Sequence, residues 1–587
     1  MPERRFYLLL GALALTLASG PYLYGWLNTP TGSLYSGLTS NIDDCLVYFS
    51  WMLEAGRGHL LHHNLFSTEA QNPKLLYLWF ALLGLIAKAS GLPLAFHLGR
   101  VLGGAALLRA VVWLLHETIQ SERARKLAFA LVCFSSGFGW LSGGYNPAKG
   151  FTLQPIDTFQ PEAITFLSLY YSPLFAPMTA LMVVFFASLL KSERTGKLTD
   201  LWPACAAGAI LGNSHTYDVV HLLAVAWVCK LFTLLPGPPP NPGRRVEKRE
   251  WKGLLIATAA CLPTTAYTAW ASRVDPLFKA RAWTNEGTFT PALWWVLLGF
   301  GLPLLFALLP QPLLPTLRRQ GGRRGDGKSS GMEESGSPLP NLLPGLGGGA
   351  GGGGKFLLIW LVIGIAVAYL PVPFQRKMLM GAHIPICLLA GVGLDALTAR
   401  LSGDFPKIAA FFGVLLTVPS NVLYLLADIG RLDSNSGTTA RKPYLSADDQ
   451  KVLAYLKEHA AETDAVVVSP DPSSVKRYPG MLNSQIDAHL NAYIGGWAGV
   501  ICYNGHWSET LAYPQKNDVT LRIFNANTDD EVRKQLLQEN QIRYVLVVNG
   551  FSEIQTERYS GVGWSVHQPA FLEPVLITDS QILYKVL

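Results

Sequence analysis

Residues 6–27 read FYLLLGALALTLASGPYLYGWL, an apolar run that contains no charged residue. A helix needs about 20 mostly apolar residues to cross the hydrocarbon core of a bilayer, so this stretch predicts a membrane span. The run follows Arg4 and Arg5 and could pass for a signal peptide. Its apolar character continues through Trp26, which favours an uncleaved first span.

Similar runs recur along the chain of 587 residues, of which 50% are hydrophobic and only 15% are charged. Soluble domains usually carry about 25% charged residues. We therefore predict a mainly α protein, a polytopic transmembrane helical bundle of about eleven spans. The candidate spans are 6–27, 93–116, 127–143, 174–190, 201–213, 218–235, 253–270, 291–309, 356–370, 382–398 and 407–427.

The apolar segment 74–90 decides the topology, because it either crosses the membrane or lies in its interface. Basic residues gather at 4–5, 122–126, 191–197, 244–252, 318–328 and 400–407. If 74–90 does not cross, all these clusters face the cytoplasm, as the positive-inside rule requires. This predicts a multi-pass protein of the cell (inner) membrane, with a cytoplasmic N-terminus and an extracytoplasmic C-terminal domain.

The predicted domain organisation follows from these spans. We predict an N-terminal transmembrane module at 1–309 with a long first outer loop at 28–92, a flexible Gly/Pro-rich cytoplasmic linker at 310–354, the last three transmembrane helices at 355–430 and an extracytoplasmic α/β domain at 431–587. In that domain, 446–459 and 530–539 are typical of helices, and 465–468, 544–548, 575–578 and 582–586 are typical of strands. A partly parallel sheet is therefore expected.

Some function classes are disfavoured by composition. The seven cysteines are scattered without a CxxC pair, so a zinc site or a disulfide framework is not expected. The net charge of +7 comes with no basic stretch interleaved with aromatics, so no nucleic-acid partner is expected. No glycine-rich phosphate loop opens a helix in the C-terminal domain, which gives no sign of a nucleotide site.

The first outer loop carries the adjacent carboxylates Asp43 and Asp44. Such a pair suits a catalytic base acting on a hydroxyl, or a divalent metal (Mg or Mn) held by oxygens, with Asp44 as the candidate ligand. The structural alternative is a helix start, where acids favour the positive end of the helix. Farther along, Lys74 opens the apolar segment 74–90, where it could bind a lipid phosphate or simply extend toward water.

Other polar residues also fall on the predicted outer side, where ionisable groups near the membrane are costly and usually functional. His215 and Asp218 could alternatively form a hydrogen-bonded helix cap. Arg376 and Lys377 stand against the positive-inside trend and suit a phosphate or pyrophosphate group. The candidate substrate-binding residues are Lys74, Asp157, Glu162, His215, Asp218, Arg376, Lys377, His506 and Glu509. The last two lie in a polar and aromatic patch that is either a lid over the membrane site or a packed loop.

This layout resembles the GT-C glycosyltransferase superfamily, in particular family-39-like enzymes and an uncharacterised bacterial branch. The similar features are Asp43-Asp44 after the first span, the segment 72–74 that opens an interfacial helix, and the motifs around Glu162, 215–218, 374–376 and 505–507. Here Pro73-Lys74-Leu75 stands where Pro-Pro-Leu is common in that family.

The resemblance implies that a sugar is transferred from a polyprenyl-phosphate donor to an acceptor on the outer face of the membrane. Asp43 or Asp44 would act as the base, directly or with a bound divalent metal. The donor phosphate would lie against Arg376 with Lys377 or Lys74, and the other candidates would line the sugar pocket. Polyprenyl-phosphate-linked sugar and membrane lipid are then the partners. The alternatives are a transporter or flippase of a lipid-linked or anionic solute, and a non-catalytic scaffold of the same fold.

Overall fold

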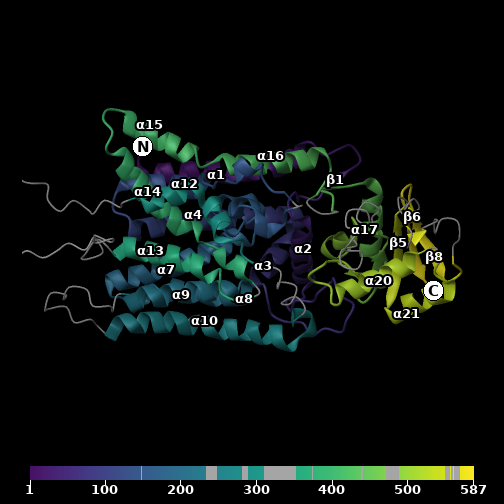
Figure 1. The fold of residues 1–587 in the computed structure, drawn as a ribbon. Coiled ribbons are helices and arrows are strands. Elements are labelled where there is room, and N and C mark those ends of the chain that lie inside the picture. The colour runs from purple at the N-terminus through teal and green to yellow at the C-terminus, as the bar shows by residue number, and fades with distance from the viewer. Residues whose placement is uncertain are drawn as a thin grey trace, which may run out of the picture.

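The computed structural model describes residues 1–146, 149–232, 248–279, 288–309, 352–372, 374–437, 441–470, 488–525, 527–548, 555–556, 559–560 and 569–587. The molecule is elongated, with a bundle of helices at one end and a smaller α/β domain at the other (Figure 1). The N-terminus lies at the end of the bundle away from this domain, which we call the distal end; the opposite end is the domain end. The predicted linker falls outside the described residues from 310 to 351.

The bundle is that of a multi-pass membrane protein. Within the described residues, five helical segments are long and apolar enough to cross a bilayer: α1 (Glu3–Leu27), α4 (Leu92–Thr118), α7 (Phe175–Thr195), Trp251–Val274 of α10 (Lys248–Val274), and Gln375–Thr398. The last segment joins the short helix η7 (Gln375–Leu379) to α14 (His383–Thr398). A sixth span is possible if α15 (Phe405–Leu415) and α16 (Pro419–Asp433), bent by 43°, form one broken span.

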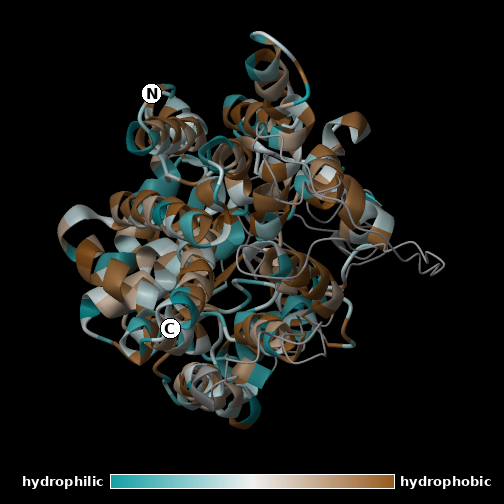
Figure 2. Cartoon of the chain, turned by 90° about the vertical axis from the view of Figure 1, so that its left-hand side faces the viewer, coloured by the Kyte–Doolittle hydropathy of each residue, from teal (hydrophilic) through white to brown (hydrophobic). Residues whose placement is uncertain are grey.

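Shorter helices occupy the other predicted spans. They are α5 (Glu122–Phe134), α8 (Trp202–Ser214), α9 (Tyr217–Phe232), α12 (Leu293–Leu308) and α13 (Gly352–Val367). The bundle therefore has a helix at each predicted position, but about half of them are too short to cross alone. Figure 2 views the bundle along its axis and shows hydrophobic residues on the helices all around it. Large apolar side chains such as Leu9, Leu13, Leu255 and Leu262 are exposed, as expected of a lipid-facing surface.

The predicted span 127–143 differs most from the structure, because α5 ends at Phe134. A β-carbon on Gly137 would lie 2.2 Å from the carbonyl oxygen of Gly299, so the two backbones are in contact there. Gly301 breaks the helical geometry of α12 beside this contact, with φ 46°. The chain leaves the helix at this point because two backbones approach more closely than side chains would allow.

Segment 74–90 forms α3 (Leu78–Ser90), which packs on α2 (Ile42–Arg57) and α4. At about 1.5 Å per residue, its 13 residues span about 20 Å, less than the roughly 30 Å of a hydrocarbon core. Helices α5 and α8, which occupy predicted spans, also have 13 residues, so the interfacial position of 74–90 stays a prediction.

The basic clusters within the described residues share the distal end. Arg125 Nε lies 2.8 Å from Glu3, Arg194 Nε 2.8 Å from Glu117, and Arg123 Nη1 3.1 Å from Asp395. These pairs connect the first turn of α1 with the ends of α4, α5, α7 and α14. The basic clusters are therefore concentrated at one end of the bundle, as the positive-inside rule requires. The side of the membrane that this end faces stays a prediction.

The C-terminal domain contains a five-stranded mixed sheet of order β4-β3-β5-β9-β8. Strands β4 (Ile501–Cys502), β3 (Ala465–Val468) and β5 (Ile542–Val548) are parallel, whereas β9 (Gln581–Val586) and β8 (Leu572–Ile577) are antiparallel. This confirms the partly parallel sheet. Helix α17 (Ala447–His459) begins at the predicted cap Ser446, whose side chain accepts from Asp449 N–H, and α21 (Asp530–Glu539) has its predicted bounds.

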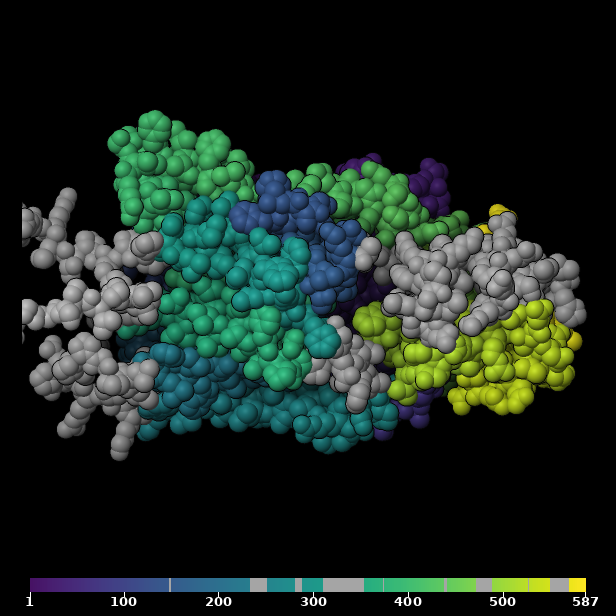
Figure 3. All heavy atoms as spheres, viewed as in Figure 1, coloured from purple at the N-terminus to yellow at the C-terminus, as the bar shows by residue number. Residues whose placement is uncertain are grey.

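The domain is seated directly on the segment predicted as the first outer loop, at one end of the bundle (Figure 3). Strand β1 (Leu34–Tyr35) of the loop pairs with β2 (Tyr444–Leu445), just before α17. Cys502 N–H donates to the Leu65 carbonyl at 2.9 Å, and Lys516 Nζ lies 2.8 Å from Glu69. Backbone and ionic contacts thus hold the domain against the loop that carries Asp43 and Asp44.

Candidate functional site at the domain end

The two adjacent carboxylates of α2 point to different partners. Asp43 is buried and its Oδ1 lies 2.6 Å from Arg441 Nε, in the segment that leads into the C-terminal domain. Asp44 keeps 41% of its side-chain surface exposed and faces His506. Successive residues of a helix point about 100° apart, so one turn can send one acid inward and the next to the surface. Asp43 is therefore engaged in an ion pair, and Asp44 is accessible.

The Asp44 carboxylate is oriented by two neighbours. Asn41 Nδ2 donates to its Oδ2 at 2.6 Å, from a residue in the left-handed conformation (φ 47°) that begins the helix. His506 Nε2 lies 3.4 Å from its Oδ1. The other ring nitrogen, His506 Nδ1, accepts from the Ser508 N–H at 3.2 Å, which places the proton of a neutral ring on Nε2, toward Asp44.

The charges of this pair stabilise each other. Partial desolvation raises the pKa of Asp44, but the contact with His506 and its positive charge outweigh this, and the pKa of Asp44 lies below its ordinary 3.8. Burial lowers the pKa of His506, yet Asp44, Asp43 and Glu509 raise it, and the net pKa lies above 6.5. Asp44 is therefore ionised at neutral pH, as a general base must be.

Glu162 and two cations lie around the same site. Glu162 accepts a hydrogen bond from Gln160 Nε2 at 2.6 Å. Burial raises the pKa of Glu162, while Arg376, Lys377 and His215 act electrostatically in the opposite direction. Lys377 also contributes to lowering the pKa of Asp44. Arg376 and Lys377 therefore act electrostatically on both Glu162 and Asp44, which lie far apart in sequence.

Arg376 is the most unusual of these groups. Its guanidinium carbon lies 4.6 Å from the Phe151 ring centroid and 5.5 Å from that of Phe159. Within the described part of the chain, its Nε and Nη1 are buried and make no hydrogen bond. A buried guanidinium normally has its donors satisfied, so these two nitrogens lack an acceptor that a bound anion would supply.

His215 and Asp218 form the pair expected of the structural alternative. His215 Nδ1 lies 2.7 Å from Asp218 Oδ2 at the start of α9, and both side chains are buried. The His215 ring contacts Tyr217, over which Lys377 Nζ lies at 5.3 Å from the ring centroid. The pair thus holds His215 against Tyr217, the ring beside Lys377. A role of His215 and Asp218 in binding a sugar stays a prediction.

Asp157 lies in a tight loop rather than beside Asp44. Its Oδ2 accepts from the N–H groups of Gly137 and Gly139 at 3.0 and 2.9 Å. Burial raises the pKa of Asp157 to about 6, although these bonds oppose the shift. The contacts give Asp157 a structural role in closing the loop after α5, and substrate binding by this residue stays a prediction.

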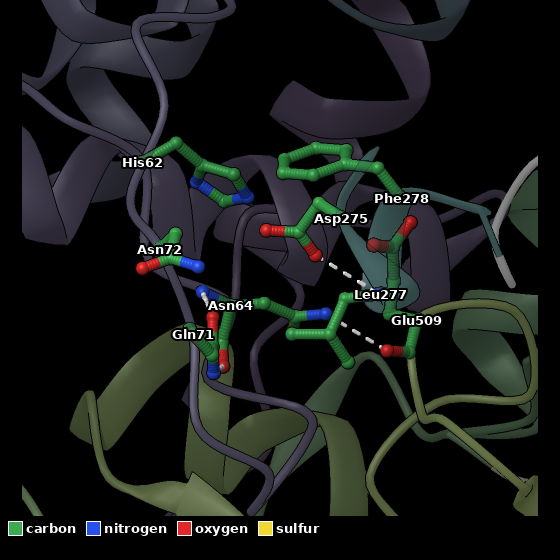
Figure 4. Close-up of a pocket in the computed structure, with 8 residues that line it drawn as sticks. All are labelled: His62, Asn64, Gln71, Asn72, Asp275, Leu277, Phe278 and Glu509. Atoms are coloured by element: carbon green, nitrogen blue, oxygen red, sulfur yellow. Dashed lines mark hydrogen bonds between the residues drawn. The ribbon is translucent and has the colours of Figure 1, made fainter. Parts of the chain in front are cut away.

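Glu509 lines a separate pocket (Figure 4), and Lys74 pairs with Asp275, another of its lining residues. Lys74 is buried, with its Nζ 3.5 Å from Asp275 and 5.9 Å from the Trp270 ring centroid. Its ammonium is thus already paired with a carboxylate, which reduces its availability for a phosphate. The Glu509 carbonyl accepts from Asn64 Nδ2 at 2.8 Å, and the carboxylate lines the pocket with Asp275.

The donor set around Asp44 does not fit a resident divalent metal. The described residues contain no group of three or more His, Cys, Asp or Glu side chains placed to hold a metal ion. Asp43 is engaged with Arg441, and His506 and the amide of Asn41 turn N–H donors toward Asp44. Mg²⁺ and Mn²⁺ prefer several oxygen ligands, so we derive no step through a metal.

Sequence reasoning missed several residues that shape the site. Arg441 and Asp275 belong to segments without a recognisable motif, and only the fold brings them to Asp43 and Lys74. Phe151 and Phe159 could have been noticed as aromatics flanking Asp157 in the second loop. Nothing in the local sequence connects them to Arg376.

The chain was compared with protein-family models, curated proteins and solved structures. No family model and no curated protein matches the chain. Among solved structures, ArnT from Cupriavidus metallidurans bound to undecaprenyl phosphate aligns with 9% identity and a TM-score of 0.49, covering 98% of this chain and 97% of that chain.

The oligosaccharyltransferase AglB from Archaeoglobus fulgidus, in complex with an inhibitory peptide and a dolichol-phosphate, aligns with 10% identity and a TM-score of 0.45, covering 94% of this chain and 70% of that one. The same protein in complex with Zn and sulfate aligns with 12% identity and a TM-score of 0.47, covering 92% of this chain and 68% of that one. Likenesses at this level do not bear on the activity of this chain.

Proposed function

We propose that this protein transfers a sugar from a polyprenyl-phosphate donor to a hydroxyl-bearing acceptor at the outer face of the membrane. The observation that carries the proposal is the convergence of an accessible, ionised carboxylate and an unsatisfied guanidinium at one electrostatic site. Asp44 supplies the first and Arg376 the second. A base and an anion-binding group are the two parts that displacement of a phosphate leaving group requires.

In the proposed mechanism, Asp44 removes the proton of the acceptor hydroxyl while its oxygen attacks the anomeric carbon of the donor sugar. The bond from that carbon to the phosphate oxygen breaks, and the electron pair leaves with the polyprenyl phosphate. Arg376 and Lys377 neutralise the charge that develops on this leaving group. His506 holds Asp44 in its ionised form from the side of the C-terminal domain.

The lipid donor explains why the anion site lies where it does. Arg376 belongs to η7, at the start of the segment Gln375–Thr398 that is able to cross a membrane. A phosphate attached to a polyprenyl chain would reach this level from the bilayer while its tail stays in the lipid. The proposed outer-face location rests on the basic distal end being cytoplasmic, and a reporter fused after Leu587 should then be found outside the cell.

A donor panel tests the proposal. The purified protein would be incubated with labelled polyprenyl-phosphate sugars and acceptor lipids, and transfer and donor binding would be measured separately. Asp44→Asn should lower the transfer rate by about 10²–10⁴-fold while leaving donor binding intact. Arg376→Ala should weaken donor binding itself.

Matched controls are available at the distal end, where Asp404 and Arg400 are exposed. Asp404→Asn and Arg400→Ala should change neither transfer nor donor binding. Failure of every donor to bind or react would refute the proposal. Movement of a lipid-linked or anionic solute across vesicles, without transfer, would support the transporter alternative instead.

A further inference from the structure

Asp428 is a buried acid that the proposed mechanism does not use. It belongs to α16, which runs toward the domain end of the bundle (Figure 1). Its Oδ2 accepts hydrogen bonds from two hydroxyls, Ser40 Oγ at 2.5 Å and Tyr170 OH. Its Oδ1 pairs with Arg431 of the same helix. Since Tyr170 belongs to α6 (Thr165–Tyr171), the carboxylate joins α16, α6 and the residues just before α2.

A buried carboxylate is a costly way to join helices. An ionised group must be paired and hydrogen-bonded to be tolerated away from water, and well-packed neutral side chains often stabilise a fold as well or better. A charged acceptor, however, makes shorter and stronger hydrogen bonds than a neutral one. The choice of an acid at position 428 therefore indicates that the exact position of one of its donors matters.

The donor Ser40 directly precedes the strained start of α2. Asn41 has φ 47° and ψ 51°, a left-handed conformation that residues other than glycine rarely adopt and that persists only where the surroundings determine it. On one side of Asn41, the Ser40 hydroxyl is bound to Asp428. On the other side, the Asn41 carbonyl accepts from the Cys45 N–H at 3.1 Å. The left-handed residue is therefore anchored both before and after.

The side chain of Asn41 carries this anchoring to the candidate base. Asn41 Nδ2 donates to Asp44 Oδ2 at 2.6 Å, while His506 Nε2 lies 3.4 Å from Asp44 Oδ1. One oxygen of Asp44 is thus held from the bundle and the other from the C-terminal domain. The contacts from Asp428 through Ser40 and Asn41 form the bundle side of this arrangement.

Other contacts hold the same segment farther from Asp44. Ser36 Oγ donates to the Pro443 carbonyl at 2.9 Å, and the Gly37 carbonyl lies 2.8 Å from His97 Nε2 of α4. These contacts fix the beginning of the segment 36–41. Asp428 holds the residue next to Asn41, so it is the side chain best placed to determine where α2 begins.

We propose that Asp428 is a positioning residue for Asp44: through Ser40 and Asn41 it fixes the direction in which the Asp44 carboxylate faces the acceptor hydroxyl. This inference rests on the proposed function and adds to it a residue that does not touch the substrate. A base that is misplaced by a fraction of an ångström loses rate while the affinity for substrate is kept. Arg376 takes no part in this chain of contacts, so donor binding is independent of Asp428.

Two variants in the full-length protein, held in lipid nanodiscs, test the inference through transfer. Asp428→Asn should lower kcat about 10-fold or more, because the base loses its alignment. Ser40→Ala should lower kcat about 3–10-fold, because it removes one hydrogen bond to a charged group. In both, the KM for the donor and the Kd for undecaprenyl phosphate should stay at the wild-type values.

The serine also provides a rescue. Ser40→Thr keeps the hydroxyl and should restore kcat to within about 2-fold of the wild type. Ser40→Ala leaves the pair of Asp428 and Arg431 intact, so the inference stays testable even if Asp428→Asn does not fold.

Matched controls lie on the same two helices. Asp433 of α16 also accepts from a tyrosine hydroxyl, that of Tyr24 at 2.6 Å, but it is exposed and has no contact with the segment before α2. The hydroxyl of Ser50 in α2 donates to the Val47 carbonyl at 2.7 Å, within its own helix. Asp433→Asn and Ser50→Ala should therefore leave kcat unchanged.

Chemical labelling of Asp44 gives a measurement that does not depend on transfer. Burial raises the pKa of Asp44, and the hydrogen bond from Asn41 is one of the contacts that lower it. A water-soluble carbodiimide reacts with the protonated carboxyl group. At pH 5, labelling of Asp44 relative to the exposed Asp404 should therefore rise about 2–5-fold in Asp428→Asn and Ser40→Ala, and should not rise in Asp433→Asn. Mass spectrometry of the labelled peptides would measure this.

The positioning role is overturned if Asp428→Asn and Ser40→Ala keep the wild-type labelling of Asp44, whatever their kcat. It is also overturned if Asp433→Asn lowers kcat as much as Asp428→Asn does. Failure of the proposed function gives a different result: no donor reacts with the wild type, while the labelling of Asp44 still depends on Asp428 and Ser40. The two failures are therefore distinguishable.

Discussion

The two ends of the helical bundle carry charged residues in different ways. At the distal end, charges form pairs near helix ends with at least one exposed partner, such as Arg194 with Glu117 and, at the start of α15, Lys407 with Asp404. At the domain end, charges are buried and come from segments far apart in sequence, as for Asp43 with Arg441. The guanidinium of Arg376 there has two nitrogens without a hydrogen-bond partner among the described residues.

This difference separates charges that set topology from charges that can perform chemistry. Water screens an exposed ion pair, so removing it lowers the stability of the fold only slightly. The role of such basic residues is to keep one end of the bundle on one side of the membrane. A buried charge is costly unless it is paired, so an unsatisfied one indicates a ligand. The predictions below test whether the two ends differ in this way.

The largest effect is expected at the buried pair of the domain end. Asp43→Asn leaves Arg441 buried opposite a neutral group, which should destabilise the docked C-terminal domain by about 3–5 kcal/mol. Pulse proteolysis in urea would measure this. The double variant Asp43→Leu with Arg441→Met should recover much of the loss, and an equally unstable double variant would contradict the role of the ion pair.

A smaller effect is expected at Arg376. Arg376→Lys keeps the positive charge but loses the planar fork that binds two phosphate oxygens. Binding of undecaprenyl phosphate should weaken about 10-fold, equivalent to roughly 1.4 kcal/mol. Unchanged affinity would mean that the charge alone matters, or that the anion binds elsewhere.

The pair of His506 and Asp44 should make domain docking depend on pH. The pKa of His506 is raised in the folded protein, so its stabilising contribution is present below 6.5 and is lost as the pH rises through the raised value. The pKa of Asp44 is lowered, so its part is lost only in acid, as the pH falls below 3.8 toward the lowered value.

Proteolysis of the docked domain, followed from pH 6 upward, should therefore show a decrease in stability on the order of 1 kcal/mol. His506→Gln should remove the pH dependence associated with this pair. A wild-type protein whose docking strengthens as the pH rises through this range would contradict the assignment.

The smallest effect is expected at the distal end. Arg194→Ala removes a partly exposed partner of Glu117 and should cost less than about 1 kcal/mol, with no change in transfer or binding. Thermal unfolding monitored by tryptophan fluorescence would measure the stability. A loss as large as that of Asp43→Asn would remove the distinction between the two ends.

Much of the fold was predictable because its causes are local. The apolar run of α1, the cap Ser446 with Asp449, and the helix Asp530–Glu539 follow from composition and from signals within a few residues. The prediction for 127–143 was too long because α5 ends where Gly137 meets the backbone of Gly299, a contact between distant segments. Local patterns carry no information about such an encounter.

The candidate site was predictable only as a set of residues. Charge placement assigned Asp44, Glu162 and Arg376 to one side of the membrane, since ionisable groups near lipid are costly. It could not separate Asp43 from Asp44, because both are aspartates at the start of the same helix. Their different roles depend on Arg441 and His506, which the C-terminal domain brings to them.

The sequence by itself determined that this is a multi-pass membrane protein with a mixed α/β domain at its C-terminal end, because hydrophobicity and strand or helix periodicity are properties of short segments. Only the tertiary structure decided which acid is accessible, which cation lacks a partner and where a pocket opens. These properties depend on desolvation and distance between segments that are remote in the chain, and such quantities exist only once the chain is folded.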